Sequence, residues 1–314
     1  MTTNIGGDKN TSVGFQSLQA NTEGNKNVAV GMYSMYANTT AADNVAVGYE
    51  SMKVNTTGTR NIAIGYGAYD AADTEDDNLA IGYSALGGAI AGGTKNIAIG
   101  NYSLDANTSG INNTAIGYDA MTTNIGGDKN TSVGFQSLQA NTEGNKNVAV
   151  GMYSMYANTT AADNVAVGYE SMKVNTTGTK NIAIGYNAYD NADTESNNLA
   201  IGYDALGGAI NGGEYNVAVG NYSLDANTTG DYNVAVGDNA LSANTTGNYN
   251  TATGGWALNA NTTGAANTAI GLEALTANTT ANYNTALGSE TLKANTTGTG
   301  NTASGAEALK ANTT

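Results

Sequence analysis

The sequence predicts an all-β protein, a parallel β-solenoid of about 18 coils with 17 residues and two short strands in each coil. A five-residue box, Asn-x-(Ala/Ser)-x-Gly, occurs 18 times, and its copies are 17 residues apart except for two spacings of 18. Residues within each repeat alternate with a period of two, which is typical of strands, and 17 residues are too few for a repeat built from a helix pair. The boxes begin at Asn10, Asn27, Asn44, Asn61, Asn78, Asn96, Asn113, Asn130, Asn147, Asn164, Asn181, Asn198, Asn216, Asn233, Asn250, Asn267, Asn284 and Asn301.

Each element of a coil follows from its residue types. The box supplies one strand, for example residues 62–64, and the Ala-Leu-x-Ala stretch, for example residues 240–243, supplies the second. Gly ends every box, as a corner with positive φ would require. Asn opens every box and also begins the Asn-Thr-Thr corner, because Asn tolerates left-handed backbone and hydrogen-bonds to its own turn. Representative structural corners are Asn61, Gly65, Asn96, Gly100, Asn216 and Gly220.

Two apolar columns are expected in the core, and a third column predicts an interface. The three residues between the Asn and the Gly of each box are numbered here as box positions one to three. The third box position is Val, Ile or Leu in 16 of 18 boxes, and the second strand carries Leu or Met in 16 coils. The middle box position is only Ala or Ser, so something packs closely on it, either the opposite wall of the same coil or a neighbouring chain. We favour the neighbouring chain, in a parallel, in-register homo-oligomer. The predicted interface residues include Ala29, Ala46, Ala63, Ala80, Ala218 and Ala235.

The domain organisation is predicted to be one continuous solenoid over residues 1–314. A seven-coil block, residues 1–120, reappears almost unchanged at residues 121–240, and plainer consensus coils continue to residue 314. Both ends of the chain fall inside a coil. We therefore expect a segment of a longer fibre protein, and end-to-end stacking of identical chains into a filament is the alternative.

Composition excludes most chemistry. The chain has no Cys and no His, so it has no thiolate or imidazole for a metal site or a nucleophile–base pair. A net charge of -15 disfavours nucleic acid and anionic membranes, and no stretch approaches the length of a membrane span. We expect no enzyme, no cofactor and no membrane insertion; a depolymerase is disfavoured because no coil is chemically set apart.

Three groups are candidates for ligand contacts or modification, and each also has a structural interpretation. The densest acidic group could hold a hard cation but also fits a solvated loop, so no metal is expected; it comprises Asp70, Asp73, Glu75, Asp76 and Asp77. Tyrosines directly after the box Gly, together with Trp256, could contact sugars, although such ladders also stabilise sheets without a ligand; the candidates are Tyr49, Tyr66, Tyr83, Tyr118, Tyr169, Tyr186, Tyr203 and Trp256. The Asn-Thr-Thr corner forms N-glycosylation sequons that turn chemistry already explains, at Asn38, Asn55, Asn107, Asn158, Asn175, Asn227, Asn244, Asn261, Asn278 and Asn295.

The boxes Asn-Val-Ala-Val-Gly, Asn-Ile-Ala-Ile-Gly and Asn-Thr-Ala-Ile-Gly resemble the head repeats of trimeric autotransporter adhesins. The longer unit, which runs on to Asn-Thr-Thr-Gly, is similar to repeats of phage tail fibres and bacterial surface proteins. The resemblance covers about residues 10–314 and implies a left-handed β-roll, a trimer and an extracellular location on a virion or a cell surface. Its period of 17 departs from the shorter period of adhesin heads. The function expected is the structural shaft of an extracellular fibre that presents a receptor-binding tip; the alternative is an adhesin head that binds host glycans or matrix through Tyr and Thr columns.

Overall fold

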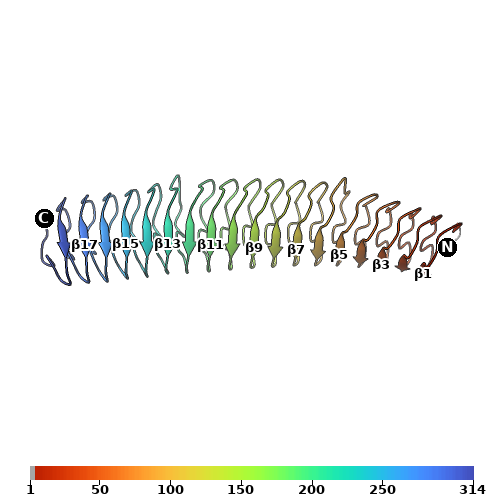
Figure 1. Ribbon diagram of the computed structural model, residues 1–314, viewed down its shortest axis with the longest axis horizontal. Helices are drawn as coiled ribbons and strands as arrows, with labels where there is room; N and C mark the ends of the chain where they lie inside the picture. Colours follow the sequence, from red (N-terminus) through yellow and green to blue (C-terminus); the bar gives the residue numbers. More distant parts are fainter. Residues whose placement is uncertain (1–3) are drawn as a thin grey trace. The chain divides into compact units, whose positions relative to one another are not determined.

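The computed structural model describes residues 4–314 and confirms a parallel β-solenoid with one box per coil (Figure 1). The described residues form 18 strands of three residues each and no helix. They divide into two compact units, the first ending at Ala161 and the second comprising Ala162–Thr314. The strands of the first unit are β1 (Thr11–Val13), β2 (Val28–Val30), β3 (Val45–Val47), β4 (Ile62–Ile64), β5 (Leu79–Ile81), β6 (Ile97–Ile99), β7 (Thr114–Ile116), β8 (Thr131–Val133) and β9 (Val148–Val150). Those of the second are β10 (Val165–Val167), β11 (Ile182–Ile184), β12 (Leu199–Ile201), β13 (Val217–Val219), β14 (Val234–Val236), β15 (Thr251–Thr253), β16 (Thr268–Ile270), β17 (Thr285–Leu287) and β18 (Thr302–Ser304).

Within each unit the strands form a parallel sheet in strict register. Each strand pairs with the next one along the chain, and equivalent box positions lie opposite one another, as Ala46 lies opposite Ala63 between β3 and β4. The two 18-residue spacings keep this register, since Ala80 still pairs with Ala98 and Ala200 with Ala218. The extra residue is therefore absorbed in a turn. One continuous solenoid over residues 1–314, and its left-handedness, stay predictions.

The prediction of a second strand in each coil, made from the Ala-Leu-x-Ala alternation, is wrong. Residues 240–243 form successive turns, and Leu241 has a left-handed φ of 52°. Its N–H donates to Ala257 in the next coil at 3.0 Å, whereas the N–H of Asn239 donates to Asn221 in the preceding coil at 2.9 Å. Left-handed residues two apart thus place side chains with the same period as a strand. The Leu or Met column is nevertheless buried as predicted, except for Leu309 in the last coil, which is 53% exposed; Leu18, Met35 and Met52 are fully enclosed.

The sidedness predicted for the box strand is reversed. The middle residue points into the coil and its neighbours point outward: Ala63 is fully buried, whereas Ile62 and Ile64 are each 39% exposed. The third box position is therefore not core, and the Ala column is not an interface between chains. The alternative cover, the opposite wall of the same coil, is confirmed, because the hydroxyl of Ser132 in the middle of β8 donates to the carbonyl oxygen of Ser137 on that wall at 2.9 Å. The alanines assigned to the interface are all fully buried in the single chain: Ala29, Ala46, Ala63, Ala80, Ala218 and Ala235.

The box glycines adopt positive φ, as predicted. Gly65 has a φ of 141°, and Gly100 and Gly220 have values of 133° and 135°. A Cβ on Gly65 would also overlap the carbonyl oxygen of Gly82 in the next coil. Both the conformation and the close approach of neighbouring coils therefore require Gly at this corner.

The box asparagines serve a different purpose from the one predicted. Asn61, Asn96 and Asn216 are fully buried and are not among the positive-φ residues; the residue before each box takes that conformation instead. The Asn61 side chain accepts the N–H of Asn78 at 2.8 Å and donates to the Glu75 carbonyl oxygen at 2.7 Å. The same contacts recur from box to box within each unit. Asn is needed because it pairs a donor with an acceptor inside the coil, where an unpaired polar group would be costly.

A second asparagine ladder runs inside the Asn-Thr-Thr corner. Each amide donates to its own turn, as predicted, with Asn124 reaching the Gly127 carbonyl oxygen at 3.1 Å. Several of these amides also donate to the amide of the preceding coil, and Asn124 lies 2.7 Å from Asn107. The sequon asparagines belong to this ladder and are fully buried. A glycosylating enzyme has no access to them in the folded chain.

Candidate functional site

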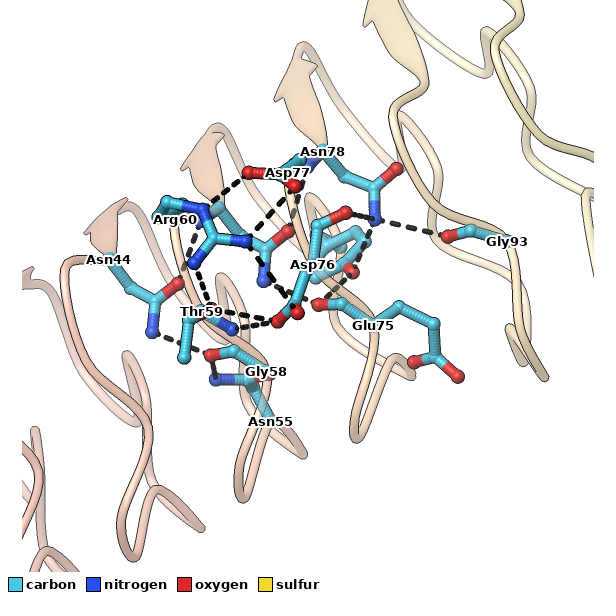
Figure 2. A network of polar contacts seen from close by, with 12 residues as sticks. Asn44, Asn55, Gly58, Thr59, Arg60, Glu75, Asp76, Asp77, Asn78 and Gly93 are labelled. Atoms are coloured by element: carbon cyan, nitrogen blue, oxygen red, sulfur yellow. Dashed lines mark hydrogen bonds and ion pairs between the residues drawn. The ribbon is translucent and has the colours of Figure 1, made fainter.

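The acidic group at residues 70–77 lies on one turn, but its carboxylates diverge. Asp76 accepts the N–H of Thr59 at 2.6 Å, and Asp77 accepts Arg60 Nε at 2.6 Å and Nη2 at 3.1 Å. Figure 2 shows the Glu75 carboxylate pointing away from both of them. Each carboxylate therefore serves a different neighbour rather than a common centre.

The remaining two members of the acidic group are also occupied separately. Asp73 accepts the hydroxyl of Thr56 and its N–H, the latter at 3.2 Å. Asp70 is half-buried, and burial is the main cause that raises the pKa of its carboxyl. Over residues 4–314 no three Asp or Glu side chains gather as a metal would need.

Arg60 and Asp77 form the most regular ion pair of this turn. The two side chains meet through two parallel N–H···O contacts across neighbouring coils, and Asp76 lies 3.7 Å from the same guanidinium (Figure 2). The hydrogen bonds from Arg60 hold the pKa of the Asp77 carboxyl below its usual range. Because the pair faces solvent, its contribution to stability is small.

Glu75 and Tyr69 fill the interior where the corner asparagine ladder is interrupted. Ala72 and Ile90 take the place of asparagine in two successive coils. The Tyr69 hydroxyl accepts the Asn78 amide at 2.8 Å and donates to the Glu75 carbonyl oxygen at 3.1 Å. The buried Glu75 carboxylate accepts three backbone N–H groups, including that of Gly92 at 3.0 Å. These two residues replace the missing amides, which gives them a structural role.

The tyrosines after the box Gly form part of a longer aromatic ladder. Tyr49, Tyr66 and Tyr83 stack with ring centroids 5.0 and 5.1 Å apart and planes within 16°. Where this position is not aromatic, the next residue supplies the ring. The first unit thus has one ring in each of nine consecutive coils: Phe15, Tyr33, Tyr49, Tyr66, Tyr83, Tyr102, Tyr118, Phe135 and Tyr153.

The sequence-based column missed five of these rings, although a signal was present. Phe15 and Phe135 occupy the predicted position but are not tyrosines, and Tyr33, Tyr102 and Tyr153 lie one residue later. Reading the two adjacent positions together gives exactly one aromatic residue in each coil from the first box to the ninth. A strand-like alternation would send adjacent residues to opposite sides, so the pair was not recognised as one column.

Ring geometry decides what the ladder can bind. Three of its eight ring contacts are stacked, namely Tyr49–Tyr66, Tyr66–Tyr83 and Tyr118–Phe135, and the other five are edge-to-face. In stacked pairs each ring covers a face of its neighbour, so mainly ring edges remain open to solvent. A sugar that packs on an aromatic face needs the opposite arrangement. Trp256 is 44% exposed, and no other aromatic ring contacts it among the described residues. The structure therefore separates Trp256 from Tyr49, Tyr66 and Tyr83, with which the sequence grouped it.

The outer face of the strands is the largest repeated feature that the sequence analysis did not place at the surface. Its two columns are the first and third box positions, which are Val, Ile, Leu or Thr in every strand except for Ser304. All of them are half-buried or exposed. No charged residue interrupts either column, in a chain with a net charge of -15.

No family model and no curated protein matches this chain. Residues 4–314 also contain no helix of the length and apolarity that a membrane crossing needs. The conclusions on function therefore rest on the residues themselves and on the resemblance of their repeat.

Proposed function

We propose that the chain is a structural, non-enzymatic shaft segment of an extracellular fibre, as expected for a phage tail fibre or a bacterial surface appendage. Nearly equivalent coils support this function, since no coil differs from the others by a convergent set of reactive groups. The carboxylates of the acidic turn and the buried tyrosine serve the backbone of neighbouring coils. The repeat's resemblance to fibre and adhesin proteins supplies the extracellular setting.

The observation that carries the proposal is the apolar outer face of the strands in each of the two units. Monomeric proteins rarely expose contiguous apolar patches larger than about 300–600 Å². Here two uncharged columns of Val, Ile, Leu and Thr continue from strand to strand within each unit, and Ile64, Ile116 and Ile184 are 39%, 37% and 38% exposed. A sheet face of this kind is covered in the assembled state of most proteins.

A second copy of the chain is the partner that this face fits. The columns repeat once per strand, so a partner must offer complementary apolar rows at the same spacing over many strands. An identical chain in parallel register does so by construction, and the absence of charge from the face removes repulsion between copies. The in-register homo-oligomer is thus retained, with the interface moved from the Ala column to the Val and Ile columns. The resemblance to adhesin heads implies three copies.

Introducing a charge on this face tests the proposal. Ile64→Lys with Ile184→Lys places one buried charge per unit in the interface, which should release single folded chains, since an unpaired buried charge is costly. Sedimentation velocity would report the mass, and circular dichroism the fold. Thr57→Lys with Thr177→Lys adds the same charge at exposed turn positions and should leave the oligomer intact. A wild-type protein that sediments as a folded single chain at micromolar concentration would refute self-association.

A binding module is the second candidate function, and one observation favours it. Trp256 offers an exposed ring that no other ring covers, as sugar recognition requires. Selective binding on a glycan array that is lost in Trp256→Ala would support an adhesin. If instead Tyr66→Ala and Tyr83→Ala abolish binding while Trp256→Ala does not, the stacked ladder is the contact surface.

A further inference from the structure

A second tyrosine stack lies on a different turn of the coil from the aromatic ladder. Tyr215, Tyr232 and Tyr249 each directly precede a box, and each adopts the same left-handed conformation, with φ between 55° and 59°. Their ring centroids are 4.9 and 5.3 Å apart, and their planes are tilted by only 1° and 5°. These are the most nearly parallel aromatic pairs recorded in residues 4–314.

The fold does not require these three rings. The equivalent positions one block earlier are Lys95, Asn112 and Lys129, and their backbones adopt the same left-handed conformation. The three rings are 45%, 47% and 63% exposed, so they contribute little to the core. Three stacked phenols on an exposed turn therefore point to a role beyond folding.

We propose that Tyr215, Tyr232 and Tyr249 form a site of oxidative tyrosine coupling that joins neighbouring coils covalently. A one-electron oxidant of the haem peroxidase and hydrogen peroxide class removes one electron and one proton from each of two phenols. The two phenoxyl radicals form a carbon–carbon bond between ring positions ortho to the hydroxyls, and the ring hydrogens then return to the oxygens. Two tyrosines and one hydrogen peroxide thus give one dityrosine and two waters.

The geometry favours coupling within one chain at this site. A radical on Tyr232 has a parallel ring on each side, with ring centroids 4.9 and 5.3 Å away. The sheet register of β13–β15 holds the rings at these positions. The three rings lie on successive coils with Tyr232 in the middle, so Tyr232 is the shared partner of both possible links.

Two tyrosines of the same chain are built-in controls. Tyr283 occupies the same turn position and is 72% exposed, but its neighbours in that column are Ala266 and Gly300. Tyr189 is buried inside the coil. Exposure without a stacked neighbour, or a ring without exposure, should not give an intrachain link.

The test is oxidation of the full chain with peroxidase and hydrogen peroxide, followed by proteolysis and mass spectrometry. We expect cross-linked peptides that join Tyr232 to Tyr215 or Tyr249, each lighter by two hydrogens, from protein that runs as a single chain on a denaturing gel. Tyr232→Phe keeps the stacked ring but removes the shared phenol, so it should abolish both links. Tyr283→Phe should leave their yield unchanged.

Two further measurements decide the outcome. In urea-unfolded protein the preference for Tyr232 should disappear, because register no longer holds the rings together. The oxidised wild type should unfold at a higher denaturant concentration than the oxidised Tyr232→Phe variant. Absence of links at Tyr232, links that map mainly to tyrosines without a stacked neighbour, or the same distribution in folded and unfolded chains would overturn the proposal. These readouts concern links within one chain and are independent of whether copies assemble into a fibre.

Discussion

The acidic turn of the first block and its copy 120 residues later have the same backbone but different chemistry. The N–H of Asp77 donates to the Thr59 carbonyl oxygen at 3.1 Å, and the N–H of Asn197 donates to that of Thr179 at 3.0 Å. Yet the residues that face solvent differ. Arg60, Asp76 and Asp77 in the first copy correspond to Lys180, Ser196 and Asn197 in the second.

One of these exchanges shows what the turn needs. Asp76 accepts the N–H of Thr59 at 2.6 Å, and Ser196 accepts the N–H of Thr179 at 3.0 Å. Both residues provide an oxygen that accepts the Thr N–H, but only Asp76 carries a negative charge. The turn therefore requires an oxygen that satisfies a backbone donor, and the ion pair with Arg60 is an addition.

Inside the coil the two copies do not differ. Tyr189 donates to the Glu195 carbonyl oxygen at 3.3 Å, and the Glu195 carboxylate accepts the N–H of Gly212 at 2.9 Å, as Tyr69 and Glu75 do in the first copy. Interior contacts leave no alternative partner such as water, so substitution there costs more than at the surface. The variants below measure this difference between interior and surface.

The largest effect is expected at the box glycine, equally in both copies. Gly65→Val and Gly185→Val place a side chain on a φ of 141° and against a carbonyl oxygen of the next coil. We expect a loss of more than about 4 kcal/mol in the free energy of unfolding, or no folded protein. Gly92→Ala is the control, because its φ is 103° but nothing lies near the added Cβ, so strain alone should cost about 1–3 kcal/mol. Thermal unfolding followed by circular dichroism measures both; wild-type melting of Gly65→Val would refute the close approach of coils.

The next largest effect is expected in the buried Leu column. Leu86→Ala and Leu206→Ala each remove a fully buried side chain from equivalent coils and should each cost about 2–5 kcal/mol in unfolding free energy. Urea denaturation of the two variants should give equal values within error. Costs that resemble those of a surface substitution would mean that the interior can collapse around the cavity.

The repeat, the parallel register and the Gly corners could be predicted from the sequence because each depends on spacing or on one residue type. Which face of the box strand points inward could not be predicted, because Val-Ala-Val is apolar on both faces. The larger volume of Val and Ile suggested that they face the core, but Ala does. The opposing wall, with Met35 and Ser34 inside, leaves room for only a small residue on the strand. The constant Ala or Ser column was the correct signal, but it fitted a neighbouring chain as well as the facing wall.

The wall opposite the strand, formed by turns such as residues 240–243, could not be predicted for a related reason. Alternation with a period of two arises from strands and equally from left-handed residues spaced two apart, as at Leu241 and Asn239. Leucine in this conformation costs roughly 1–2 kcal/mol, so propensity argues against it. Hydrogen bonds to both adjacent coils offset that cost, and they exist only once the coils have stacked.

A smaller effect is expected from pH, and it should differ between the copies. Burial, and then the charge of Asp204, raise the pKa of Asp190 to about 6; Asp70 is raised as well, but it has Ser84 in place of Asp204. An unfolded aspartate titrates near pH 3.9, so the folded state binds this proton more tightly, and the stabilisation is full below about pH 4 and lost as the pH rises to 6.

Asp190→Asn should therefore stabilise the protein at pH 7 by about 1 kcal/mol after allowance for solvent screening, and Asp70→Asn by less. Titration by NMR gives the matched test: Asp204→Ser should lower the pKa of Asp190, and Ser84→Asp should raise that of Asp70. An Asp190 pKa that does not respond to Asp204→Ser would leave burial as the sole cause.

The smallest effect is expected when the surface of the first copy is converted into that of the second. Arg60→Lys with Asp77→Asn removes an exposed ion pair and keeps every backbone contact, so the free energy of unfolding should fall less than for any of the destabilising variants above. Asp76→Ser should be similarly mild, because Ser196 shows that a hydroxyl satisfies the same N–H. Asp76→Ala leaves the Thr59 N–H without that acceptor and should cost more than Asp76→Ser. Urea denaturation at low and high salt separates the two causes: the cost of losing the ion pair should shrink with salt, since salt screens exposed charges, whereas the difference between Ala and Ser should persist.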